Sequence, residues 1–161
     1  MKNYWFFLIA MLMVFTACEN SDSVNNRDAF IGVYEYQTDG QVDIFVDGVK
    51  MLSPTLDGDG MFEIVKEGDK NGVAIIGSSF AQIDSLHAVV KGSKLVLVTD
   101  EYAYNAQGMT LILKLSNDEM PMVDNKITWE TNITGNGAFG DKDVTCSGNL
   151  RLQANKKLLL D

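Results

Sequence analysis

Apolar and polar residues alternate along short segments through most of this chain, and this period of two constrains the fold more than any other feature. In the segment 30–36, one face of an extended backbone carries Phe30, Gly32, Tyr34 and Tyr36. The same alternation returns in the segments 42–46, 86–90, 109–115, 127–133 and 144–152. The dipeptides Asp39-Gly40 and Asp47-Gly48 suit two-residue hairpin turns. Regular short strands with such turns predict an antiparallel β-meander.

The pattern predicts roughly nine or ten strands and no helix inside the domain. Polar or proline-containing stretches are interpreted as loops, at 54–59, 100–107 and 117–125. A sheet of this many strands has to protect its edges, either by closing on itself or by splitting into two layers. We therefore predict an all-β fold, an antiparallel up-and-down meander closed or nearly closed into a barrel, with a β-sandwich as the alternative.

The first residues have the marks of a secretory signal peptide. Lys2 precedes an apolar stretch, 4–17, that is too short to span a bilayer as a permanent helix. The stretch ends in Phe15-Thr16-Ala17-Cys18, which resembles the lipobox of bacterial lipoproteins. The resemblance implies that the Cys18 thiol carries a diacylglycerol and that further acylation, typically by palmitate, completes the anchor. Several acyl chains hold a protein stably at a membrane without a spanning segment.

These features divide the chain into four parts. Residues 1–17 are predicted to be the signal peptide, and 18–28 the lipidated cysteine with a polar, flexible tether. A single β-barrel domain is expected over 29–155, followed by a tail over 156–161. Acidic residues soon after the cysteine resemble export signals that some Gram-negative bacteria use for surface lipoproteins. We therefore expect an outer-membrane lipoprotein of the cell envelope, exposed at the surface.

The charge of the chain excludes one class of partner. The formal charge is −9, and the leader contributes only the positive Lys2, so the remainder carries about −10. Nucleic-acid backbones select basic surfaces, and anionic head groups attract them too. We expect no nucleic-acid partner, and membrane association through the lipid anchor alone.

The chain is poor in residues that carry catalysis or bind metals. With Cys18 lipidated, Cys146 has no partner for a disulfide and is expected to be a small core residue. His87 alternates with apolar residues and is expected to face outward, and no Gly-x-Ser-x-Gly elbow accompanies it. One histidine is too few for most histidine-based metal sites. We predict no enzyme, no catalytic or metal-binding residues and no cofactor.

The opening of the first strand is similar to that of a known family. Phe30-x-Gly32-x-Tyr34 resembles the Gly-x-Trp start of lipocalins and the wider calycin group. The resemblance implies a barrel in which Tyr34 plugs one end and Arg151 stacks over its ring. Arg151 falls on the face opposite Leu150, so this arrangement requires a bulge at Gly148 to correct the phase. Lipocalin-like barrels also imply a small apolar ligand.

Three aromatic residues are candidates for contact with a ligand or partner: Tyr102, Tyr104 and Trp129. The two tyrosines are expected in a polar loop, where burial is not forced. Two functions remain open, a lipocalin-like barrel that binds a small apolar ligand and an envelope interaction or adhesion module. The second would contact a glycan or an envelope protein through its loops. An apolar cavity larger than roughly 300 Å3 would favour the first function.

Overall fold

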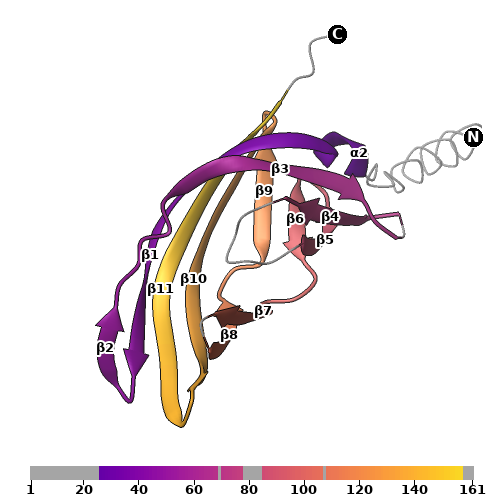
Figure 1. The fold of residues 1–161 in the computed structure, drawn as a ribbon. Coiled ribbons are helices and arrows are strands. Elements are labelled where there is room, and N and C mark those ends of the chain that lie inside the picture. The colour runs from indigo at the N-terminus through magenta and orange to yellow at the C-terminus, as the bar shows by residue number, and fades with distance from the viewer. Residues whose placement is uncertain (1–25, 69, 78–84, 107, 158–161) are drawn as a thin grey trace, which may run out of the picture.

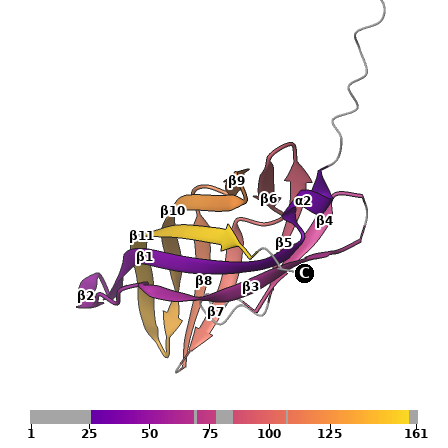
Figure 2. The same cartoon turned by 90° about the horizontal axis from the view of Figure 1, so that it is seen from above.

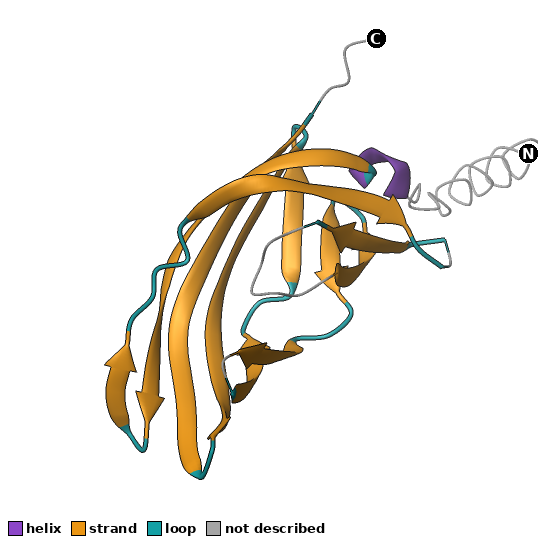
Figure 3. Cartoon of the chain, viewed as in Figure 1, coloured by secondary structure: helices purple, strands orange, loops and turns teal. Residues whose placement is uncertain are grey.

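A computed structural model describes residues 26–68, 70–77, 85–106 and 108–157, and these residues are almost entirely β-strand (Figures 1 and 3). A four-residue helix, α2 (Arg27–Phe30), precedes the first strand. The strands are β1 (Gly32–Val46), β2 (Val49–Leu52), β3 (Gly58–Lys66), β4 (Gly72–Ile76), β5 (Ser85–Lys91), β6 (Lys94–Leu97), β7 (Glu101–Ala106), β8 (Met109–Leu115), β9 (Glu119–Val123), β10 (Lys126–Phe139) and β11 (Lys142–Lys156). The predicted all-β fold is confirmed.

Eight of these strands form a closed antiparallel barrel. Around the ring they follow the order β1, β3, β4, β5, β6, β9, β10 and β11, and the pairing of β11 with β1 closes it. Each barrel strand therefore pairs with the next barrel strand along the chain. The strands β2, β7 and β8 are not part of the ring. This is the up-and-down meander that the alternation predicted, and the closed ring is adopted in place of the β-sandwich. Figure 2 shows β11, β1 and β3 running side by side in this order.

Three strands are much longer than the barrel requires. β1, β10 and β11 continue past it and form an extension, flanked by β8 and β7 on one side and by β2 on the other (Figure 1). Two glycines on the long strands lie very close to the backbones of neighbouring strands. A Cβ atom at Gly148 would lie 2.0 Å from the Gln41 carbonyl oxygen, and one at Gly137 would lie 1.9 Å from the Thr110 carbonyl oxygen. Glycine is required at both positions because the strands come too close for a side chain.

Side chains fill the interior of the barrel. The largest fully buried residues include Tyr34, Ile64, Leu95 and Ile127 of the barrel strands and Phe30 of α2. The rings of Tyr34 and Phe62 stack with their centroids 5.3 Å apart. The Tyr34 hydroxyl donates to the Phe30 carbonyl oxygen at 2.8 Å, and burial raises the pKa of Tyr34 to about 12. Among the described residues, the buried apolar side chains pack against one another as a core cluster.

All three segments predicted to be loops contain strand residues, since β3 already begins at Gly58, inside 54–59. β7 occupies most of 100–107, and β9 lies within 117–125. Both strands are short, and β7 carries the polar residues Glu101 and Asn105 on its exposed face, so its composition resembles that of a turn. β9 contains Pro121, and proline is uncommon within strands, so the segment was predicted to be a loop. Pairing with β8 and with β6 and β10 makes these segments strands despite their composition.

The ends of the chain are only partly described. Residues 1–25, including the predicted signal peptide and Cys18, lie outside the described residues, as do residues 158–161. β11 runs to Lys156, one residue into the segment expected to be a tail. Within the described residues, no helix combines the length and the apolar character needed to cross a membrane.

Candidate functional site

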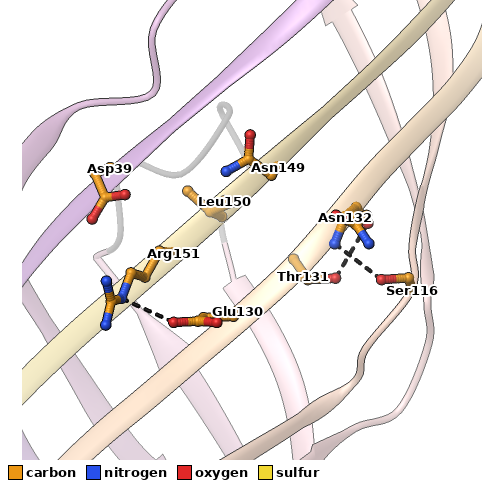
Figure 4. A pocket seen from close by; sticks show the side chains of 8 residues that line it. All are labelled: Asp39, Ser116, Glu130, Thr131, Asn132, Asn149, Leu150 and Arg151. Carbon is orange, nitrogen blue, oxygen red and sulfur yellow. Dashed lines mark hydrogen bonds and ion pairs between the residues drawn. The ribbon is translucent and has the colours of Figure 1, made fainter.

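A polar groove lies on the outer face of the three long strands. Its lining comes from β1, β10, β11 and the connection between β8 and β9, and consists of Asp39, Ser116, Glu130, Thr131, Asn132, Asn149, Leu150 and Arg151 (Figure 4). The alternation explains why the groove is polar, since the polar residues between the apolar inward positions of each strand point outward. The groove has a volume of about 510 Å3, which is in the range of small-molecule sites.

The groove forms where β10 changes its neighbour. β10 pairs with β9 at Lys126 and Ile127, and with β8 only from Ile133 onward. Between these stretches the β8–β9 connection supplies the hydrogen bonds in place of a strand. Asn132 N–H donates to the Ser116 hydroxyl at 2.9 Å, and Ser116 N–H donates to the Asn132 carbonyl oxygen at 3.0 Å. This interruption of the sheet holds Ser116 at the edge of the groove.

Asn117, the next residue of the β8–β9 connection, makes further hydrogen bonds to β10. The Asn117 side-chain amide donates to the Glu130 carbonyl oxygen at 2.9 Å, and its backbone N–H donates to the Thr131 hydroxyl at 3.1 Å. The Trp129 indole N–H donates in turn to the Asn117 carbonyl oxygen at 2.9 Å. These bonds tie the connection to three successive residues of β10, so the groove has a fixed wall.

The charged part of the groove is a row across three strands. Arg151 lies opposite Glu130 on β10 and opposite Asp39 on β1. The Arg151 Nε atom is 3.0 Å from Glu130 Oε1. The row holds one positive guanidinium and two negative carboxylates, so its formal net charge is −1. The remaining N–H groups of Arg151 can still donate to a ligand.

The next row supplies amides. Asn132 lies opposite Asn149, with Gln41 beyond it on β1. The side chains of Asp39, Asn132 and Asn149 form no hydrogen bond or ion pair with another described residue, and all three are exposed. Carboxylates accept hydrogen bonds and amides both donate and accept. The groove therefore presents a mixed set of donors and acceptors to solvent, without a metal-binding cluster among the described residues.

The structure does not bring Arg151 to Tyr34. Tyr34 lies opposite Lys156 on β11, five residues beyond Arg151. The β1–β11 register runs through Gly148 without a bulge, so Arg151 stays on the outer face while Tyr34 is buried inside. Lys156 is the cation on the Tyr34 side, and its ammonium donates to the Ala29 carbonyl oxygen at 2.7 Å. The expected stacking of Arg151 on Tyr34 does not form, because the two side chains leave opposite faces.

The three candidate contact aromatics are packed against the core. Trp129 is only 5% exposed and belongs to the interior, so it is unable to contact a partner in this conformation. Tyr102 and Tyr104 lie on β7, opposite Leu113 and Leu111, and are half-buried. The Tyr102 hydroxyl donates to the Thr99 carbonyl oxygen at 2.9 Å. Burial, together with the charges of two nearby aspartates, raises the pKa of Tyr102 to about 12.

Sequence reasoning missed most of the groove. Asp39, Asn132 and Asn149 are outward residues of predicted strands, and nothing in their local sequence distinguishes them from any solvated strand face. Arg151 was singled out for a different role. The cross-strand register brings Asp39 beside Arg151, which is 112 residues further along the chain, and brings Asn132 beside Asn149.

The strand pairing defines this chain at the level of its architecture, a closed antiparallel up-and-down β-barrel with an extended sheet. No protein-family description and no curated protein matches the sequence. Among solved structures, the ywiB protein from Bacillus subtilis superimposes with a TM-score of 0.36 and 10% sequence identity, over 83% of this chain and 99% of that one. A likeness of this degree carries no functional argument.

Proposed function

We propose that this chain is a lipid-anchored interaction module of the bacterial outer membrane that binds a glycan through the polar groove. The observation that supports this proposal most strongly is the contrast between the two candidate binding places. The described side chains inside the barrel pack into a core cluster, whereas the groove is open and carries polar side chains without described partners. This contrast favours an interaction module over the binding of a small apolar ligand.

The chemistry of the groove suits a hydroxylated ligand. A sugar ring presents several hydroxyl groups that each donate and accept, and the groove offers the carboxylate of Asp39, the amides of Asn132 and Asn149, and the guanidinium of Arg151. The two amides lie on adjacent strands, roughly 5 Å apart along the hydrogen-bonding direction, which matches the spacing of substituents on one sugar unit. A purely cationic or anionic ligand would meet both signs of charge.

The anchor would place the domain at the membrane with a defined end nearest the lipid. Seven residues separate Cys18 from Asn26, where the described chain begins, and such a tether spans at most about 30 Å. The α2 end of the barrel would therefore stay close to the bilayer. The extension with β2 lies at the other end of β1 and would point away (Figures 1 and 2). The groove, midway along the long strands, would remain accessible from the side.

The groove is tested by removing its two free amides together. We expect full-length, lipidated protein in detergent to bind members of a glycan array, and Asn132→Ala/Asn149→Ala to lose at least about tenfold in affinity. Each lost hydrogen bond is worth about 1 kcal/mol, so two account for a loss of this size. Isothermal titration with the best glycan measures the affinities.

The matched control keeps the strands and changes exposed amides outside the groove. Asn136 lies on β10 and Asn155 on β11, both exposed and neither part of the lining. Asn136→Ala/Asn155→Ala is expected to bind as the wild type does. Equal loss in both double variants, or no glycan binding at all, would contradict the proposal. Selective binding of an envelope protein through the same groove would replace glycan with protein as the partner.

A further inference from the structure

Three side chains far from the groove form a connected chain of hydrogen bonds on the barrel wall. Ser85 and His87 are two residues apart on β5 and share its outer face. The Ser85 hydroxyl lies 3.3 Å from His87 Nε2, and His87 Nδ1 lies 2.6 Å from Glu67 Oε2. Glu67 follows β3 at the turn into β4, and the pairing of β4 with β5 brings that turn beside His87.

The order of the atoms is that of a nucleophile, a base and an orienting acid. A carboxylate at Nδ1 favours the tautomer that has its proton there, because the carboxylate only accepts. The Nε2 lone pair then faces the Ser85 hydroxyl, which donates to it. A nucleophile within reach of a base, with the base oriented by a third group, is the signature of an activated serine. This arrangement was not predicted from the sequence, because Glu67 is twenty residues from His87 in the chain.

Two apolar residues flank His87, one on each side of β5. Ala74 lies opposite His87 on β4 and is buried. On the other side, the Val98 N–H donates to the His87 carbonyl oxygen at 2.9 Å, and the Val98 side chain is 65% exposed. An apolar group bound beside His87 would cover Val98. These neighbours favour a short acyl chain over a charged or strongly polar substituent.

We propose that Ser85, His87 and Glu67 constitute a nucleophilic site that accepts short acyl groups from activated esters. The Ser85 oxygen attacks the ester carbonyl while His87 Nε2 takes the hydroxyl proton, so the bond from the oxygen to the acyl carbon forms. The bond from that carbon to the leaving oxygen breaks, and the alkoxide or phenolate departs. The imidazolium passes its proton to the leaving group or to water. Glu67 is a positioning residue that holds the ring and its tautomer.

A second half-reaction returns the site to its starting state. Water attacks the acyl-serine carbonyl, His87 takes a proton from that water, and the carboxylic acid leaves as Ser85 regains its proton. His87 and Glu67 have side chains 51% and 44% exposed, so water weakens the electrostatic support for the oxyanion. Slow turnover with a detectable acyl-enzyme is therefore expected. This activity is separate from glycan binding, since the two sites share no residue and lie on different strands.

The site is tested with p-nitrophenyl butyrate on the full-length protein. We expect release of p-nitrophenolate, one butyryl group per chain by intact mass, and fragment spectra that place it on Ser85. His87→Ala should lower the acylation rate by at least about tenfold, because a general base contributes a hundredfold or more. Added imidazole should restore part of that rate by taking the place of the missing ring.

Two further sets of variants distinguish a loss of acylation chemistry from a general disturbance of the fold. Glu67→Gln should slow acylation, and Glu67→Asp should restore most of it, since a carboxylate still faces Nδ1. Ser147→Ala, which removes an exposed serine on β11, should leave the rate unchanged. Acylation of Ser85 that is equally fast in His87→Ala would overturn the proposal, as would butyryl groups found only on lysines. Glycan binding is measured independently in each variant, so failure of one proposal does not disguise failure of the other.

Discussion

Replacing Gly148 by alanine is expected to destabilise the protein by about 3 kcal/mol or more, or to prevent its folding. The new Cβ atom would lie 2.0 Å from the Gln41 carbonyl oxygen and 2.7 Å from Val42 Cα. Both are backbone atoms of β1, so no side-chain rotation relieves the clash. The strands β1 and β11 would have to separate at the point where their pairing closes the barrel. Urea unfolding followed by circular dichroism measures the loss.

Gly58→Ala is the matched control for this prediction. A Cβ atom there would lie 3.5 Å from the Thr38 hydroxyl, which is an ordinary contact, and Gly58 does not have a positive φ. Alanine should be neutral or stabilise by up to about 1 kcal/mol, because it restricts the unfolded chain. A Gly148→Ala protein as stable as Gly58→Ala would show that β1 and β11 are not this close.

Replacing Cys18 by serine is expected to move the whole protein from the membrane fraction to the soluble fraction. A serine hydroxyl does not take the thioether-linked diacylglycerol, and the anchor depends on more than one acyl chain. The described domain offers no alternative spanning helix. Fractionation of cells that express the variant, with immunoblotting of each fraction, measures the shift.

Cys146→Ala serves as the control for the anchor. Cys146 is buried on the inner face of β11, and burial raises the pKa of its thiol. The variant keeps Cys18 and should remain in the membrane fraction. Membrane association that survives Cys18→Ser would show that something other than the lipid holds the protein there.

The alternation predicted the architecture because a period of two decides which face of each strand is buried. Tyr34 and Tyr36 were placed on one face, and both are buried. The outward position of His87 was likewise predicted and is confirmed. Closure of the sheet into a barrel was predicted because a sheet of many strands has to protect its edges. The short strands β7 and β9 were missed because tertiary pairing, rather than local composition, makes them strands.

The candidate sites could not be predicted, because they depend on cross-strand register. Arg151 was assigned to Tyr34 by resemblance, whereas the uninterrupted register places it between Glu130 and Asp39. Ser85 and His87 are close in sequence, but Glu67 reaches them only through the pairing of β4 with β5. Register is set by turns and packing along the whole barrel. A single sequence does not specify which outward residues become neighbours.

Native mass spectrometry of the lipidated protein, purified from its own host, tests the central claim most directly. The claim is that the barrel interior is filled by side chains and that partners bind outside it. We predict a mass equal to the lipidated chain, with no bound lipophile that survives mild activation. A stoichiometric apolar molecule that is retained by the wild type, and also by Asn132→Ala/Asn149→Ala, would contradict the claim, because it would place a ligand inside the barrel.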